Sequence, residues 1–137
     1  MRADKLIAQA TEARRRAYAP YSHFLVGAAL ETKDGKIYLG CNVENASYSA
    51  TCCAERVAFG AAIAAGERSF SSMAIVGGRE GEELTSFCMP CGVCRQVICE
   101  LCDADFTVKV TNGQEIRTYT PSQLLPDAFS ASDIIKE

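Results

Sequence analysis

The segments Cys53-Ala54-Glu55 and Pro90-Cys91-Gly92-Val93-Cys94 constrain the tertiary structure of this chain most strongly. They carry the parts of a catalytic zinc site, which needs three protein ligands, an open fourth position for water, and a carboxylate that moves protons without binding the metal. Cys53, Cys91 and Cys94 are the candidate ligands, and Glu55 is the candidate proton carrier. A fold that makes this site must bring together two segments that lie far apart in the sequence.

The spacing of these residues predicts two helices that begin at the metal. Cys91 and Cys94 are three residues apart, so they share one face of a helix whose start is marked by Pro90. The alanine-rich run 53–65 predicts the second helix, and the positive ends of both helices favour deprotonated thiols. Glu55 lies in the first turn and points away from the ligand direction. It can therefore reach the water without replacing it.

This combination resembles the signature of zinc nucleobase deaminases, in the variant with three cysteine ligands. Replacing the 4-amino group of a cytosine by oxygen needs hydroxide at neutral pH, and zinc lowers the pKa of bound water from about 15.7 to roughly 7. One group must also take a proton from the water, protonate ring nitrogen N3 and help the amino group to leave as ammonia. Glu55 is placed for this work.

Arg56 follows Glu55 directly and suggests how the charge of the site is balanced. Three thiolates on one divalent cation leave a net charge of about −1, which weakens the zinc as a Lewis acid. Hydrogen bonds from Arg56 to the cysteine sulfurs would draw electron density away from them. An ordinary surface arginine is the alternative interpretation.

The chain has eight cysteines, which also permits other uses of cysteine. A disulfide framework suits a secreted protein, but residues 1–16 contain no apolar core of a secretion signal. We therefore expect a cytoplasmic protein with reduced thiols. An iron–sulfur motif beginning at Cys88, or a closed zinc site that includes Cys88, leaves Glu55 unexplained. His23, the single histidine, lies outside both motifs and is expected in a solvent-facing loop.

Length and charge indicate a small domain that acts on small molecules. The 137 residues predict one domain, 1–137, and 48% of them are apolar. The net charge of −3 and the lack of a basic stripe argue against a polynucleotide partner. No apolar run is long enough to cross a membrane, so no membrane partner is expected.

Helix and strand signals alternate along the chain, which predicts a three-layer αβα sandwich of the α/β class around a mixed five-stranded sheet. The first helix is expected from Leu6 to Ala17, ended by Ala19-Pro20, and a flexible segment is expected at 77–85. Strands are expected at 24–32, 36–41, 72–76, 106–110 and 115–119, with a short last helix at 121–125.

Beyond the metal motif, the sequence resembles the small homotetrameric cytidine deaminases of nucleoside salvage over nearly its whole length. The matching stretches are Ala19-Pro20-Tyr21-Ser22 with Phe24, Val26-Gly27-Ala28-Ala29, Gly40-Cys41-Asn42-Val43-Glu44-Asn45-Ala46-Ser47-Tyr48, Cys53-Ala54-Glu55-Arg56, Pro90-Cys91-Gly92-Val93-Cys94-Arg95-Gln96 and Leu124-Leu125-Pro126-Asp127-Ala128-Phe129. The stretch from Asn42 to Tyr48 is the most specific, because deaminases of polynucleotides, nucleotides and antibiotics share the metal motif. Cys52 and Cys88 are additional thiols without an evident use.

The resemblance implies a cytidine deaminase-like fold, one Zn²⁺ per subunit, and hydrolysis of cytidine and 2′-deoxycytidine to the uridine forms and ammonia. It implies that Asn42 and Glu44 hydrogen-bond the ribose, with Glu44 on the 3′-hydroxyl. It further implies that Phe24 packs against the pyrimidine and that the backbone of Ala54 meets the base. Three more residues would reach a neighbouring subunit's pocket, so that active sites are shared: Ala46, Tyr48 and Phe129.

Two other functions stay open at this point. One is deamination of a different cytosine compound, such as an aminoacyl-nucleoside antibiotic, although the stretch from Asn42 to Tyr48 would not be expected there. The other is a noncatalytic module in which zinc is only structural. Phe24 and Phe129 also have plain structural interpretations, as the start of an apolar strand and as an anchor for the tail.

Overall fold

The computed structural model describes residues 4–135 and contains a mixed five-stranded sheet in the order β2-β1-β3-β4-β5. Strands β3 and β4 are parallel, and the other neighbours are antiparallel. The strands are β1 (Phe24–Thr32), β2 (Ile37–Cys41), β3 (Phe70–Arg79), β4 (Thr107–Thr111) and β5 (Ile116–Tyr119). This arrangement confirms the mixed sheet that the sequence predicts.

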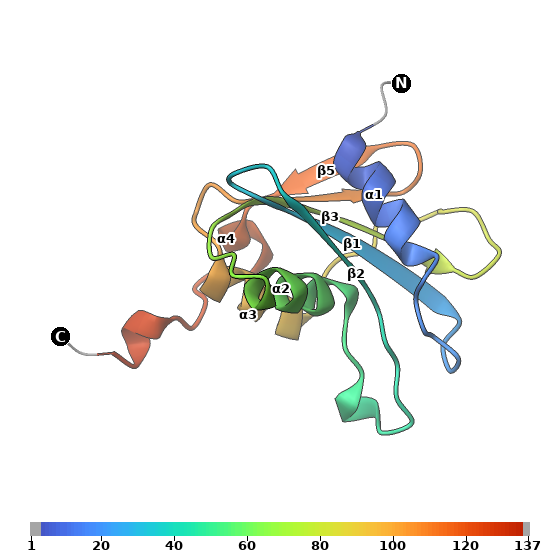
Figure 1. Ribbon diagram of the computed structural model, residues 1–137, viewed down its shortest axis with the longest axis horizontal. Helices are drawn as coiled ribbons and strands as arrows, with labels where there is room; N and C mark the ends of the chain where they lie inside the picture. The colour runs from blue at the N-terminus through green and yellow to red at the C-terminus, as the bar shows by residue number, and fades with distance from the viewer. Residues whose placement is uncertain (1–3, 136–137) are drawn as a thin grey trace.

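Helices cover both faces of the sheet and complete the predicted three-layer sandwich (Figure 1). One face carries α1 (Lys5–Arg14), and the other carries α2 (Ala54–Ala64), α3 (Gly92–Leu101) and the short α4 (Pro121–Leu124). Two short 3₁₀ helices, η1 (Tyr48–Ala50) and η2 (Ala131–Asp133), lie in the loop after β2 and in the C-terminal tail.

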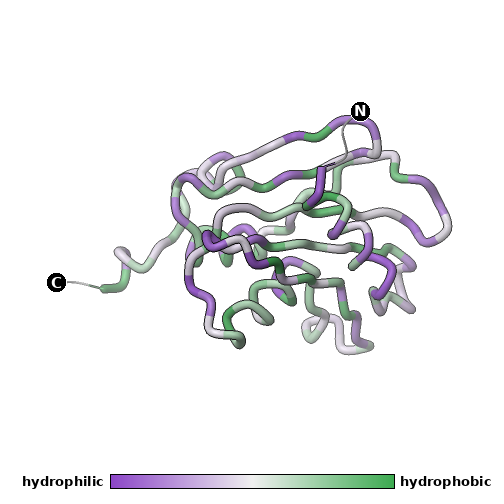
Figure 2. Tube along the Cα trace, turned by 45° about the horizontal axis from the view of Figure 1, so that its top comes forward, coloured by the Kyte–Doolittle hydropathy of each residue, from purple (hydrophilic) through white to green (hydrophobic). Residues whose placement is uncertain are grey.

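The two cores lie on opposite faces of the central strands because successive side chains of a strand point in opposite directions. Ala28 and Leu30 of β1 face α2 and α3, whereas Ala29 faces α1. With both faces covered, the central strands are continuously apolar rather than alternating. Figure 2 shows pale and green stretches along the middle of the sheet and purple stretches in several of the loops that connect its elements.

Gly40 of β2 permits an unusually close contact between the sheet and the start of α2. A Cβ atom at Gly40 would lie 2.2 Å from the carbonyl oxygen of Ala54 and 2.5 Å from the backbone nitrogen of Ala58. Any larger residue would therefore push the first turn of α2 away from the sheet. That first turn holds the candidate catalytic glutamate.

Two predicted boundaries were wrong. Strand β3 continues to Arg79, because Gly77 and Gly78 pair with β1 instead of opening a flexible segment. Helix α1 ends at Arg14, before Ala17, because Tyr18 forms an isolated bridge with Val43 and draws the chain into an extended path. Between residues 4 and 135, no helix has the length and apolar character needed to cross a bilayer.

Candidate active site

The helices α2 and α3 begin side by side and bring the three predicted cysteine ligands together. Cys53 is the N-cap of α2, Cys91 is the N-cap of α3, and Cys94 lies in the first turn of α3. Their sulfur atoms all lie within 4.8 Å of one another, and the Cys53 and Cys91 sulfurs are 3.7 Å apart. Tetrahedral zinc with Zn–S bonds of about 2.3 Å requires sulfurs about 3.8 Å apart. The cluster therefore fits one zinc ion per chain.

The burial of the cluster also suits a metal that must meet a substrate. Cys94 is buried, Cys53 is partly buried, and Cys91 is exposed, so one side of the cluster opens to solvent. Cys88 is not among the three clustered thiols, which argues against a closed site of four cysteines. All eight cysteines, each within the described residues, are free thiols.

Arg56 lies beside the cluster as the sequence suggests. Its Nη2 atom is 3.6 Å from the sulfur of Cys53 and 3.4 Å from the carbonyl oxygen of Thr51. The neighbouring Cys94 thiol and then the Arg56 guanidinium lower the pKa of Cys53 to about 5. The same contact between the two thiols, together with burial, raises the pKa of Cys94. One sulfur of the cluster is thus poised as a thiolate, with a positive charge next to it.

Glu55 is almost completely buried in the first turn of α2, with 4% of its surface exposed. Burial raises the pKa of its carboxyl group, and the nearby Cys53 adds to this effect. A carboxylate with a raised pKa is a better proton acceptor near neutral pH than an exposed one. A carboxyl group at this location, next to three thiols, is of the kind that a catalytic zinc site uses as its acid–base group.

Cys88 packs against Gly77 of β3, close to the ring of Phe24. A Cβ atom at Gly77 would lie 2.5 Å from the sulfur of Cys88 and 3.2 Å from Cε1 of Phe24. Burial, and then the charge of Glu55, raise the pKa of Cys88 to about 12, so its thiol stays neutral. The extra thiol therefore packs against β3 and the core as a small apolar group.

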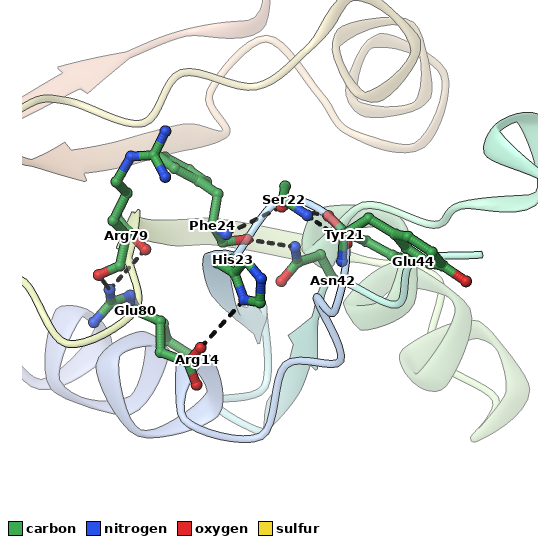
Figure 3. Close-up of polar contacts among 10 residues, drawn as sticks. Arg14, Tyr21, Ser22, His23, Phe24, Asn42, Glu44, Arg79 and Glu80 are labelled. Atoms are coloured by element: carbon green, nitrogen blue, oxygen red, sulfur yellow. Dashed lines mark hydrogen bonds and ion pairs between the residues drawn. The ribbon is translucent and has the colours of Figure 1, made fainter. Parts of the chain in front are cut away.

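Asn42 and Glu44 hold the start of β1 through hydrogen bonds (Figure 3). The Asn42 Nδ2 donates to the carbonyl oxygen of Phe24, and its Oδ1 accepts from the backbone nitrogen of Val26, both at 2.9 Å. Glu44 Oε1 accepts from the backbone nitrogens of Tyr21 and Ser22 at 3.0 and 3.1 Å. The hydroxyl of Ser22, which donates to Glu44 Oε2 and is the leading cause of the lowered pKa of Glu44, has no signal in the sequence analysis.

Ala54 starts α2 between Cys53 and Glu55, whereas the remaining predicted residues are spread over the surface. Ala46 and Tyr48 lie in the loop after β2, and Tyr48 is 79% exposed. Phe129 lies in the C-terminal tail and is 58% exposed. Figure 1 shows the loop projecting at the bottom of the view and the tail at its left, so the two leave the molecule at separate places. A single chain does not bring Tyr48 and Phe129 to one place.

Comparisons with known proteins agree with this geometry. The family model for the cytidine and deoxycytidylate deaminase zinc-binding region matches residues 1–110. The cytidine deaminase of Sporosarcina psychrophila is 50% identical over 135 residues, which cover 98% of this chain and 96% of that protein. The blasticidin-S deaminase of Bacillus cereus is 31% identical over 125 residues, covering 89% of this chain and 88% of that protein.

A crystal structure of the cytidine deaminase from Burkholderia pseudomallei has the same fold, with a TM-score of 0.85 and 50% identity. The match covers 94% of this chain and 100% of that one. This chain therefore belongs to the family of cytidine and deoxycytidylate deaminases that share a zinc-binding region.

Proposed function

We propose that this chain is a zinc-dependent hydrolase that converts cytidine and 2′-deoxycytidine into uridine and 2′-deoxyuridine with release of ammonia, as a single deaminase domain over residues 1–137. The observation that carries the proposal is the buried Glu55 in the turn that follows Cys53, beside the cluster of three cysteines. We place this reaction in pyrimidine salvage in the cytoplasm.

Cys53, Cys91 and Cys94 would hold the zinc ion, and Arg56 offsets part of their negative charge through its contact with Cys53. A zinc ion in this site supplies a nucleophile at neutral pH by lowering the pKa of a water molecule that it binds. The exposed side of the cluster at Cys91 leaves room for that water and for the substrate.

Glu55 moves the protons. It takes a proton from the attacking water while the oxygen bonds to C4 of the pyrimidine, and it delivers that proton to N3. It then takes the remaining hydroxyl proton and delivers it to the amino nitrogen, so the C4–N bond breaks and ammonia leaves. The product keeps a C4 carbonyl and a proton on N3, and Glu55 returns to its initial state. The raised pKa of Glu55 suits both directions of transfer.

The start of β1 and the stretch from Asn42 would bind the nucleoside. Phe24 is partly exposed beside Gly77 of β3 and would offer a ring face to the pyrimidine, and the backbone of Ala54 would meet the base. Asn42 and Glu44 hydrogen-bond the ribose, with Glu44 on the 3′-hydroxyl. Their existing bonds to the backbone of the 21–26 segment hold these acceptors in place before the substrate arrives.

The active site is shared between subunits of a homotetramer in this proposal. Ala46, Tyr48 and Phe129 are exposed in one chain and would complete pockets of neighbouring chains. The exposure of Tyr48 and Phe129 supports this arrangement only in that both rings are free to contact another chain, and aromatic side chains are enriched in protein interfaces.

An assay of the zinc-loaded protein against cytidine, 2′-deoxycytidine, cytosine, CMP and blasticidin S tests the proposal. We expect loss of the cytidine absorbance, with one ammonia per nucleoside, for the two free nucleosides only. Turnover of blasticidin S alone would assign the chain to antibiotic deamination, which the Bacillus cereus relative performs by its name. Bound zinc without turnover of any of these compounds would indicate a noncatalytic zinc module.

A further inference from the structure

The backbone of Phe24 is held by two side chains at the entry to β1. Its N–H donates to Oγ of Ser22 at 3.0 Å, and its carbonyl oxygen accepts from Nδ2 of Asn42 at 2.9 Å (Figure 3). Phe24 pairs with Arg79 at the end of the ladder between β1 and β3, where strand pairing stops. The orientation of this residue therefore depends on side-chain hydrogen bonds as well as on the sheet.

Ser22 connects Phe24 to Glu44. A hydroxyl has one proton to donate and two lone pairs to accept with. The Ser22 proton goes to Oε2 of Glu44, which leaves a lone pair for the N–H of Phe24. A hydrogen bond to an ionised acceptor is stronger than one between neutral groups. The carboxylate of Glu44 thus fixes the hydroxyl, and the hydroxyl fixes the start of β1.

The turn around Ser22 contains an unfavourable backbone conformation, which these hydrogen bonds help to stabilise. His23 has a φ of 58°, in the left-handed region that a residue with a side chain rarely adopts. Its backbone is fixed at both ends, since its N–H donates to Ala19 O at 3.0 Å and its carbonyl accepts from Glu80 N at 2.8 Å. Without the Ser22 hydroxyl, the residue after this turn loses a restraint at its backbone N–H.

We propose that Ser22 is a positioning residue that couples sugar recognition by Glu44 to base recognition by Phe24; this inference rests on the proposed function. Ser22 has no contact with the reacting atoms in this assignment. The Ser22 hydroxyl orients the Glu44 carboxylate toward the 3′-hydroxyl, and it holds Phe24 where its ring contacts the pyrimidine. A substrate whose sugar hydrogen-bonds to Glu44 therefore also stabilises the position of Phe24 against its base.

The test compares two substrates that differ only in the 3′-hydroxyl. In Ser22→Ala, kcat/KM for 2′-deoxycytidine should fall about tenfold or more, mainly through KM, because a hydrogen bond to a charged group is lost. The preference for 2′-deoxycytidine over 2′,3′-dideoxycytidine should fall by at least about threefold, because Glu44 is less well oriented toward the missing group. Ser22→Thr keeps the hydroxyl and should restore both values.

A double-mutant cycle between Ser22 and Glu44 separates their coupling from a general loss of structure. On a Glu44→Gln background, Ser22→Ala should cost less than about a third of its effect on the unmodified background, because both changes act through the same contact. Ser71→Ala is the matched control. The Ser71 hydroxyl also bonds the backbone of β1, at Glu31 O and Thr32 O, but at the far end of the strand. It should leave the substrate preference unchanged.

Ser22 is exposed, so truncation to alanine removes no buried packing, and Tm and zinc content should stay near those of the unmodified protein. Should Ser22→Ala unfold below the assay temperature, Ser22→Cys, with its weaker hydrogen bonds, takes its place under the same criterion. An unchanged preference between the two nucleosides in an active Ser22 variant overturns the coupling and leaves the proposed function intact. A protein that deaminates neither nucleoside overturns the proposed function, and this inference with it.

Discussion

The side-chain amide of Gln96 donates a hydrogen bond of 2.8 Å to the backbone carbonyl of Phe129, so the helix that begins at Cys91 also holds the C-terminal tail. Arg95, the preceding residue, donates from Nη1 to the carbonyl of Leu124 at 2.8 Å. The tail backbone is therefore anchored by α3 while the ring of Phe129 stays exposed. A fixed backbone with a free ring is well suited to contact a second chain.

Phe129→Ala should raise KM for cytidine by at least about tenfold, because an aromatic contact adds to the value of its buried area. Phe129→Leu keeps apolar bulk and should cost less. The measurement is steady-state kinetics on protein whose oligomeric state has been checked by mass. Equal KM values for all three proteins would contradict a substrate-facing role of this ring.

Mixed oligomers should show whether Phe129 serves its own chain or a neighbour. Subunits with only Glu55→Gln, reassembled with subunits with only Phe129→Ala, should form some pockets in which an intact Glu55 meets an intact Phe129. A fraction of sites should then recover the substrate affinity of the unmodified enzyme. If subunit exchange is proven by mass and no such high-affinity population appears, the shared-site proposal is wrong.

Glu55→Gln should retain zinc and lose nearly all turnover. The carboxamide can hydrogen-bond a water molecule but cannot carry its proton, and positioned acid–base groups contribute about 10²- to 10⁴-fold. Zinc content by elemental analysis and kcat for cytidine are the two measurements. Near-normal activity in a zinc-loaded Glu55→Gln protein would remove Glu55 from the mechanism.

An analogue without the 3′-hydroxyl should be a poor substrate. In 2′,3′-dideoxycytidine the carboxylate of Glu44 loses its sugar partner, and we expect kcat/KM to fall by about 30-fold or more relative to 2′-deoxycytidine. The Ser22 hydroxyl holds the pKa of Glu44 below its usual value, so this discrimination should be constant from about pH 5 to 8. Equal rates for the two nucleosides would show that Glu44 does not bind the 3′ position.

Asp4 should contribute to stability as both a helix cap and an ion-pair partner. Its Oδ1 accepts from the backbone nitrogens of Leu6 and Ile7 at 2.9 and 3.0 Å, and its Oδ2 lies 2.9 Å from Nζ of Lys109. Asp4→Ala should lower the free energy of unfolding by about 1 kcal/mol at pH 7. Asp4→Asn keeps a capping oxygen and should lower it less. Urea titrations of the three proteins measure the difference.

The sign of the pH effect follows from the direction of the pKa shift. Burial alone would raise the pKa of Asp4, but Lys109 and the two helix N–H groups outweigh it and hold the pKa below its usual value. The folded state therefore binds this proton less tightly than the unfolded state. The contribution should be fully present above about pH 4 and be lost as the pH falls through the folded pKa. Asp4→Asn should lack this component of acid destabilisation.

The metal cluster could be predicted from sequence because its geometry is local. The spacing of Cys91 and Cys94 places both thiols on one helix turn, and a carboxylate two residues after Cys53 falls in the first turn of the other helix. The length of β3 could not be predicted, because Gly77 and Gly78 have low strand propensity and pair only because β1 lies beside them. Tertiary contact decided that boundary.

The role of the Ser22 hydroxyl also depends on contacts that no local pattern reveals. Serine before a strand is common in turns, and nothing in the neighbouring residues predicts that Glu44, far along the chain, accepts its proton. The exposed positions of Tyr48 and Phe129 are a similar case, since their proposed partners belong to another chain. Such roles are set by the assembled surface.

The contact of Gly40 with α2 makes the alignment of the proposed zinc ligands depend on the absence of a Cβ atom at this position. Alanine at this position would force the two segments apart, because its Cβ would lie 2.2 Å from Ala54 O and ordinary contact begins at 3.4 Å, so at least 1.2 Å of clearance must be gained. The start of α2 would lift, and Cys53 and Glu55 would move with it, while Cys91 and Cys94 stay on α3. Displacements of about 1 Å can cost on the order of 10²-fold in rate. The positional precision of the proposed metal site therefore depends on Gly40 of β2, a residue to which no role in binding zinc or nucleoside is assigned.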